Sequence, residues 1–134
     1  MTAALAACGL PNVAVGDGGT VLVSTNGVEW TAASIGKTNN LSSVTYASGV
    51  FVAVGDAAFV ASSADGVSWT VRNTGKSGFN WYRVAPVSTG IMVVGDAGNY
   101  AISRTTQLLQ WDAGRISTTN ALTAVLAIGN ERLV

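Results

Sequence analysis

Three aspartates recur at one position of a repeated pattern. Asp17, Asp56 and Asp96 each follow a glycine, and successive members are about 40 residues apart. In a closed ring of repeats these carboxylates would form a circle of hard oxygen ligands of the kind that Ca²⁺ or Mg²⁺ prefers. Gly-Asp is also an ordinary tight-turn sequence, because Asp bonds to nearby backbone and Gly accepts unusual dihedral angles. The turn interpretation is favoured, so we expect neither a metal ion nor a cofactor.

Acid–base chemistry has few candidates in this sequence. There is no histidine, which removes the commonest general base and metal ligand. A glycoside hydrolase needs a pair of carboxylates, but Glu29 lies in a turn motif and Glu131 lies near the end of the sequence. The glycine-rich run at 16–19 opens no helix, so it does not form a phosphate cradle. We therefore expect no catalytic residues and no enzyme activity.

The densest aromatic stretch, at 78–83, is the candidate binding surface. It departs from the repeat, and Trp, Tyr and Arg are frequent anchors of interfaces. In the alternative interpretation Trp81 fills the core position held by Leu41 in the preceding copy, and only its two successors face outward. The candidate interface residues are Phe79, Trp81, Tyr82 and Arg83.

Composition sets limits on the partners. Of the 134 residues, 49% are hydrophobic and only 10% are charged, and seven basic residues balance seven acidic ones. A neutral, charge-poor chain has no electrostatic footprint for nucleic acid or an anionic membrane, and no apolar run reaches the length of a membrane span. The single cysteine, Cys8, excludes an internal disulfide framework. Such a surface favours association with protein chains, so we expect a homo-oligomer or another protein partner.

The elements that would position these residues form a repeat of about 40 residues. Val-Ala-Val-Gly-Asp occurs at 13–17 and 52–56, and Val-Val-Gly-Asp follows at 93–96. Such a period indicates one supersecondary unit that buries its apolar face against its neighbours. The clearest copy has β-rich runs separated by Gly- or Asp-containing turns, at 41–47, 50–54, 59–63 and 67–72. The sequence therefore predicts an all-β fold of repeated four-stranded antiparallel meanders.

Three full copies and a partial fourth account for the chain. Their predicted ranges are 1–38, 39–77, 78–118 and 119–134, with the first-copy strands near 3–8, 11–15, 20–24 and 28–33. The third copy carries two extra residues around 105–109, and in the fourth the run at 121–127 matches a first strand. Because the partial copy duplicates the first, we expect either a piece of a longer array or strands that complete a unit of another subunit.

Two turn motifs suggest a family. The segments 24–30 and 63–69 share the pattern Ser-x-Asp/Asn-Gly-x-x-Trp, whereas the third copy, 103–111, lacks the acid and the glycine. This pattern resembles a shortened Asp-box, the hairpin motif of sialidase-type BNR repeats in β-propellers. We expect the polar residues to bond within the turn, the glycines to adopt positive φ, and the tryptophans to be buried between sheets. The matching residues are Ser24, Asn26, Gly27, Trp30, Ser63, Asp65, Gly66 and Trp69.

The resemblance implies β-propeller blades and a function without catalysis. Similar repeats are common in bacteriophage tail and virion-surface proteins, and in propellers related to photosystem II assembly factors. The implied function is a structural or binding module of a phage virion that self-associates or contacts a carbohydrate or host receptor, located on the virion or an extracellular surface. The alternatives are a bacterial protein–protein docking propeller and an inactive fragment of a sialidase-like glycoside hydrolase. Three blades are too few for a conventional ring, which again predicts oligomerisation or a piece of a longer array.

Overall fold

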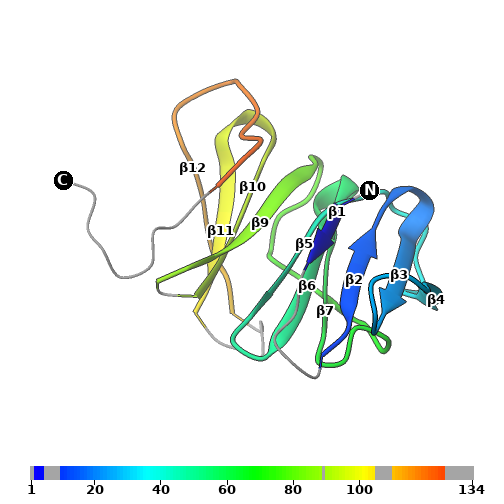
Figure 1. Cartoon of the computed structure of the whole chain (residues 1–134). Coiled ribbons are helices and arrows are strands. Elements are labelled where there is room, and N and C mark those ends of the chain that lie inside the picture. Colours follow the sequence, from blue (N-terminus) through cyan, green and yellow to red (C-terminus); the bar gives the residue numbers. More distant parts are fainter. Residues whose placement is uncertain (1, 5–9, 89, 105–109, 126–134) are drawn as a thin grey trace.

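Three separate antiparallel β-sheets make up the part of the chain that the structure describes. The computed structural model describes residues 2–4, 10–88, 90–104 and 110–125, and these contain twelve strands in three four-stranded sheets (Figure 1). In each sheet the strands lie in the order of the sequence, so each is a simple meander. The predicted all-β fold of four-stranded antiparallel meanders is confirmed at this level.

Each sheet lies inside one predicted repeat range. Sheet 1 consists of β1 (Thr2–Ala4), β2 (Asn12–Val15), β3 (Thr20–Ser24) and β4 (Thr31–Ser34). Sheet 2 consists of β5 (Leu41–Ala47), β6 (Val50–Gly55), β7 (Val60–Ser63) and β8 (Thr70–Arg72). Sheet 3 consists of β9 (Trp81–Val87), β10 (Gly90–Gly95), β11 (Asn99–Ser103) and β12 (Asp112–Arg115).

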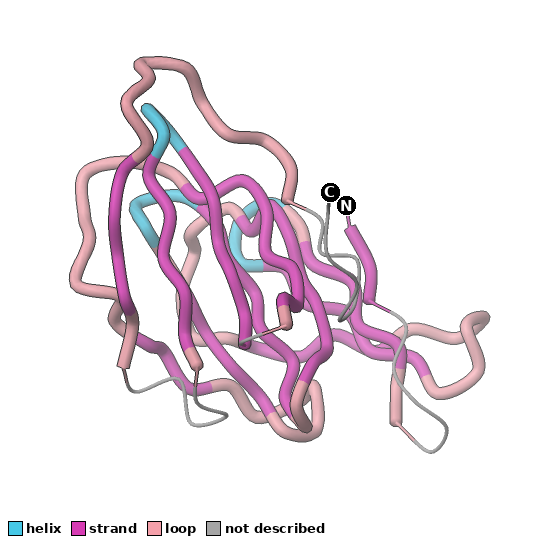
Figure 2. The backbone as a smooth tube through the Cα atoms, turned by 90° about the vertical axis from the view of Figure 1, so that its left-hand side faces the viewer, coloured by secondary structure: helices cyan, strands magenta, loops and turns pink. Residues whose placement is uncertain are grey.

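A short 3₁₀ turn joins the second and third strands of every sheet. These turns are η1 (Asp17–Gly19), η2 (Asp56–Ala58) and η3 (Asp96–Gly98), and each begins at one of the recurring aspartates. Figure 2 shows all three toward the same end of the sheets, in the upper half of the view. The Gly-Asp sequences are therefore equivalent corners between paired strands.

The fourth strand of sheets 1 and 2 begins later than the sequence predicted. The predicted run at 67–72 is a strand only over β8, and the run near 28–33 is a strand from Thr31. The reason is local: the amides of Val67 and Ser68 donate to the Asp65 carboxylate, at 2.8 and 2.9 Å, instead of to a neighbouring strand. A side-chain acceptor thus extends the turn at the expense of the strand.

Face-to-face packing of the sheets buries the core. Side chains alternate across a strand, so in β6 Phe51 and Ala53 pack toward sheet 1, while Val52 and Val54 pack toward sheet 3. The core between sheets 1 and 2 contains Val13, Val15, Val21, Ile35, Leu41, Val44, Phe51, Ala53, Phe59 and Ala61. The core between sheets 2 and 3 contains Val52, Val54, Ala58, Val60, Trp81, Val84, Ile91, Val93 and Ala101. Sheet 2 is consequently apolar on both faces.

The first strands of the three sheets lie side by side, with β5 between β1 and β9. Polar contacts join sheets 2 and 3 here, because Ser42 Oγ donates to the Trp81 carbonyl oxygen at 2.6 Å and Ser43 Oγ accepts from the Val84 amide at 3.2 Å. The contact between sheets is therefore partly directional, which fixes their relative register.

The described residues after sheet 3 begin to follow the same path. The Leu122 amide donates to the Gly95 carbonyl oxygen at 2.8 Å, much as the Leu41 amide donates to Gly16 at 3.0 Å. Arg83 Nε also donates to the Thr123 carbonyl oxygen, at 3.5 Å. Residues 121–125 nevertheless form no strand, so the predicted strand at 121–127 is absent from its described part. The rest of that run, the extra residues at 105–109, Cys8 and Glu131 lie outside the described residues.

Candidate functional site

The turn at 24–30 is held by two side chains that bond to its own backbone. Ser24 Oγ accepts from the amides of Asn26 and Gly27, at 3.3 and 2.7 Å, and donates to Asn26 Oδ1 at 3.2 Å. Asn26 Oδ1 accepts in addition from the amides of Val28 and Glu29, at 2.8 and 2.9 Å. These bonds stay within the turn, and Gly27 adopts a positive φ of 76°.

The turn at 63–69 repeats this geometry with a charged residue. Ser63 Oγ accepts from the amides of Asp65 and Gly66, and Asp65 Oδ1 takes the place of the Asn26 amide oxygen. Backbone donation from Ser68 and Val67 holds the pKa of the Asp65 carboxyl below its usual value of 3.8, with a further contribution from the Ser63 hydroxyl. The carboxylate is thus employed as a turn acceptor, which is a structural role.

Replacing Asp65 by asparagine should keep this turn and remove its pH dependence. A carboxyl with a depressed pKa stabilises the fold above its unfolded pKa, and that contribution disappears as the pH falls through the folded value. Asn26 shows that a neutral amide makes the same bonds in the equivalent turn. We expect the Asp65 side-chain carbon to titrate below 3.8 by NMR, and the D65N variant to lose less stability than the wild type between pH 5 and 2. Titration at or above 3.8 would show that the hydrogen bonds from the Val67 and Ser68 amides to Asp65 are absent in solution.

The tryptophans that end the two turns have different surroundings. Trp69 is half-buried against the core between sheets 1 and 2, and its Nε1 donates to the Gly66 carbonyl oxygen at 2.9 Å. Trp111, at the equivalent place in sheet 3, packs against the core between sheets 2 and 3. Trp30 instead has 39% of its surface exposed. The predicted burial of Trp30 between sheets is therefore wrong for the described chain, because no sheet lies on the side of sheet 1 toward which this residue packs.

The aromatic stretch at 78–83 divides between core and surface. Trp81 is completely buried in the core between sheets 2 and 3, and Phe79 packs against its ring edge-on, with centroids 4.7 Å apart. Tyr82 is half-buried and Arg83 is exposed. A hydrogen bond to the Asp96 carboxylate raises the pKa of the Tyr82 hydroxyl above its usual value of 10.0. Of the four candidate interface residues, Trp81 is not accessible, and only Tyr82 and Arg83 offer polar groups at the surface.

Two of the three recurring aspartates, Asp56 and Asp96, accept hydrogen bonds from asparagines that the sequence interpretation overlooked. Asn40 Oδ1 accepts from the Gly18 amide of η1 at 2.8 Å, while its Nδ2 donates to Asp56 at 3.1 Å. Asn80 makes a similar bridge, with its Oδ1 accepting from the Ala57 amide at 3.0 Å and its backbone N–H donating to the Asp96 carboxylate at 2.9 Å. Each asparagine thus links the 3₁₀ turns of successive sheets. The available signal was their regular spacing, since Asn40, Asn80 and Asn120 are each 40 residues apart.

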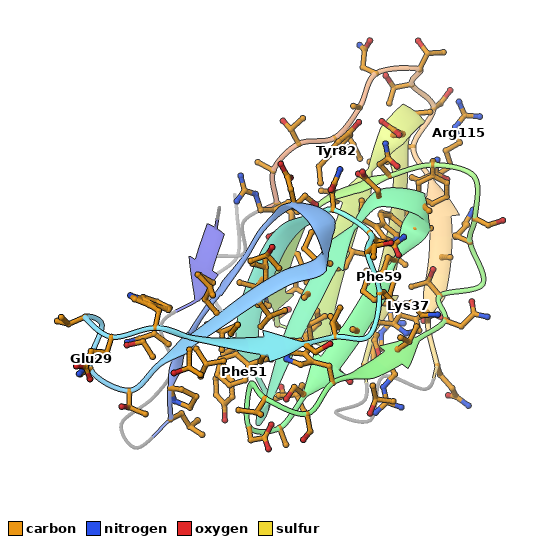
Figure 3. All side chains as sticks on the ribbon, turned by 90° about the vertical axis from the view of Figure 1, so that its right-hand side faces the viewer. Glu29, Lys37, Phe51, Phe59, Tyr82 and Arg115 are labelled. Atoms are coloured by element: carbon orange, nitrogen blue, oxygen red, sulfur yellow. The ribbon has the colours of Figure 1, made fainter. Side chains whose placement is uncertain are left out.

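The sequence offered two candidate chemistries, a metal site made by the recurring aspartates and a glycosidase-like catalytic centre. No three His, Cys, Asp or Glu side chains come together among the described residues, so the three aspartates do not share a site. Figure 3 places Glu29 at the outer end of its turn, on the opposite side of the molecule from Arg115. In the third copy Arg104 forms an ion pair with Asp112, and both side chains are more than half exposed. Such a pair contributes little to stability.

Shallow hollows recur beside the two turns. One, of about 260 Å³, is lined by Val23, Thr25, Asn26, Glu29, Thr31, Ala32, Ala33 and Val67. The other, of about 280 Å³, lies at the matching place in sheet 2 and is lined by Val50, Ser62, Ser63, Ala64, Asp65, Ser68, Thr70 and Arg72. Arg72 Nε donates to Ser62 Oγ at 2.9 Å inside it. The lining holds no pair of carboxylates, so these hollows offer contact surface and no acid–base apparatus.

Comparison with known proteins adds no relative. No protein-family model matches the chain, and no curated protein matches it. Among the described residues, no helix has the length and apolarity needed to cross a bilayer. The function of this chain is therefore inferred from its own geometry and from the motif resemblance.

Proposed function

We propose that this protein is a non-catalytic binding module built from β-propeller blades. The observation that carries the proposal is the repetition of one contact: sheets 1 and 2, and then sheets 2 and 3, pack through equivalent faces. The first strands β1, β5 and β9 lie next to one another, as the inner strands of successive blades do. A stack of this kind presents surfaces to other molecules.

The use of the acidic side chains supports a role without catalysis. Asp65 accepts two amides of its own turn, and Asp56 and Asp96 accept from the asparagine segment that precedes their sheet. Glu29 lies at the tip of an exposed turn. Carboxylates engaged in this way are acceptors that hold turns together. A paired acid and base facing a shared pocket would be needed for glycoside hydrolysis.

The motif resemblance supplies the proposed setting. Repeats similar to these are common on bacteriophage particles, where a module of this kind would associate with copies of itself, with other virion chains, or with a carbohydrate or protein receptor. Within the aromatic stretch, Arg83 is the exposed charged side chain suited to such a contact. We propose the virion surface as the location on the strength of this resemblance.

A turnover and binding experiment tests the proposed function. The full chain is incubated with a fluorogenic sialoside and, separately, applied to a glycan array with the R83A variant as the matched control. We expect release of the fluorophore at the protein-free rate, and we expect any glycan bound by the wild type to be bound less by R83A. Turnover that is lost in the E29Q variant would overturn the non-catalytic proposal.

A further inference from the structure

Each internal contact between sheets is made of the same two halves. The first half consists of alternating side chains on the second and third strands, Val13, Val15 and Val21 in sheet 1 and Val52, Val54 and Val60 in sheet 2. The second half is the opposite face of the following sheet, Phe51, Ala53 and Ala61 in sheet 2 and Ile91, Val93 and Ala101 in sheet 3. Sheet 2 therefore packs one face against the sheet before it and the other face against the sheet after it.

The outer face of sheet 3 carries a third copy of the first half. Met92, Val94 and Tyr100 hold the register positions of Val52, Val54 and Val60, and Ile102 continues the face because it pairs with Met92 across β10 and β11. Ile116 extends it beyond β12. The matching residues of the earlier copies, Ile35 and Thr74, are each only 6% exposed, whereas Ile116 is 50% exposed. Ile116 is thus accessible in the last described sheet, whereas Val94 at the centre of the same face is only 3% exposed.

The outer face of sheet 1 carries the matching second half. It consists of Asn12, Ala14, Thr20, Leu22 and Trp30, at the positions of Phe51, Ala53, Phe59, Ala61 and Trp69 in sheet 2. Trp30 is exposed where Trp69 is half-buried. The adjoining glycines agree: a Cβ on Gly66 would lie 2.8 Å from Val13 of the preceding sheet, whereas one on Gly27 would meet only the Asn12 side chain, at 3.9 Å. Ala14 at the centre of this face is only 6% exposed, so its accessible part lies toward Trp30, and no described sheet packs on it.

We propose that the outer face of sheet 3 binds the outer face of sheet 1 of a second copy of this chain. Both halves of the contact are present on one chain, and they continue an interface that the fold already uses twice. The segment 119–125 already lies at the place of the next first strand, bonded to Gly95 and Arg83, so the second copy contributes the face of β2 and β3. The association is head to tail, because the two faces are different surfaces. Two copies joined in this way place six sheets in one stack, which closes into a ring or grows into a filament according to the rotation between copies. The inference rests on the proposed binding role and specifies the partner.

The two outer faces complement each other in size. At the internal contact between sheets 1 and 2, small valines face the large rings of Phe51 and Phe59. The outer pair reverses this arrangement, because the large side chains Met92 and Tyr100 stand on sheet 3 while sheet 1 offers Asn12 and Thr20. The summed volume of a contact decides its fit more than the order of the residues does. The reversed pair therefore keeps the volume of the internal contacts.

The polar residues of the sheet 1 face are compatible with burial. Thr20 Oγ1 already donates to the Asp17 carbonyl oxygen at 2.6 Å. Asn99, at the same position in sheet 3, donates its Nδ2 to the Asp96 carbonyl oxygen at 2.8 Å and is half-buried. A side chain that is bonded within its own turn loses little when water is removed. Thr20 can thus be covered by a second copy while its hydroxyl keeps its bond to the Asp17 carbonyl oxygen.

The test measures the mass of the full chain in solution by sedimentation and light scattering, over a series of concentrations. Three substitutions place an aspartate at residues of similar exposure: I116D on the sheet 3 face, W30D on the sheet 1 face, and V71D as the control. Val71 is 47% exposed on β8, the last strand of sheet 2, and lies on the face whose inner part packs against sheet 1. It therefore takes no part in the proposed contact between copies. Circular dichroism checks that all three variants retain the β-sheet spectrum.

The expected result is a wild type and a V71D variant that both form multiples of the 13.6 kDa chain. I116D and W30D should each be monomeric at the same concentrations, with a dissociation constant raised about a hundredfold, because an unpaired charge in an apolar contact is costly. An equimolar mixture of I116D and W30D should recover a dimer, because each variant keeps the half that the other has lost.

Two outcomes would overturn the inference. One is a wild type that stays monomeric at the highest soluble concentration. The other is a wild-type oligomer that is lost in both variants and is not recovered by mixing them, because that result indicates a contact between like faces. Either result leaves the non-catalytic role standing, since that role is tested separately by the sialoside and glycan measurements.

Discussion

Replacing Trp81 by alanine is expected to lower the free energy of unfolding by about 3–5 kcal/mol, the range found for large aromatic side chains removed from a core. Trp81 is completely buried between sheets 2 and 3 and is the largest of the fully buried side chains. Its removal leaves a cavity and deprives Phe79 of its edge-on partner. Urea unfolding followed by circular dichroism measures the loss. A loss below about 1 kcal/mol would mean that the ring is not in the core.

A leucine at position 81 provides the matched comparison. Leu41 fills the equivalent position between sheets 1 and 2 and is itself buried. The buried indole N–H of Trp81 finds no acceptor among the described residues, so a leucine also removes an unsatisfied donor. W81L should therefore cost clearly less than W81A. Equal losses in the two variants would indicate a specific role for the indole that core packing does not explain.

Replacing Gly66 by alanine is expected to destabilise the chain by about 1–3 kcal/mol more than replacing Gly27, which is the usual cost of overpacking a core. Both glycines have a positive φ, 81° and 76°, in turns of the same construction, so the backbone penalty cancels between them. They differ in their neighbours, because a Cβ on Gly66 would lie only 2.8 Å from Val13, whereas one on Gly27 would meet only the Asn12 side chain, at 3.9 Å. The difference therefore reports the contact of this turn with sheet 1.

Denaturant unfolding of G66A and G27A measures that difference, at concentrations where light scattering gives the monomer mass. This condition matters because Gly27 adjoins the outer face of sheet 1, which association would cover. Equal destabilisation by the two substitutions would show that the second turn does not pack on the first sheet, and the stacking order of sheets 1 and 2 would then be wrong.

Most of the fold could be predicted from the sequence because the repeat consists of residues that determine the local structure of strands and turns. The Gly-Asp corners and the short apolar runs between them specify where strands end and turn back. The three meanders lie within the predicted ranges, and β5 has the bounds expected for it. The shift in the start of β8 could not be seen from β-propensity, because Val67 and Ser68 would suit a strand as well as they suit the turn that Asp65 holds.

The surroundings of the candidate residues were less predictable, since they depend on which sheet lies opposite. Trp30 and Trp69 occupy the same position of one motif, yet no described sheet precedes sheet 1 for Trp30 to pack on. The sequence alone allowed Trp81 to lie either in the core or at the surface. Asn40 and Asn80 were overlooked because a single asparagine before a strand looks like an ordinary loop residue, although their 40-residue spacing marked them.

The most direct measurement of the stacked-sheet arrangement is a set of nuclear Overhauser effects across the two sheet contacts. Sheets that pack as described should give a cross-peak between the Val13 methyl groups and the Phe51 ring, which both approach Gly66. They should also give one between the Val84 amide and the Ser43 β-protons, because that amide donates to Ser43 Oγ at 3.2 Å. The absence of both cross-peaks in a chain whose strands are intact would contradict face-to-face stacking of equivalent sheets.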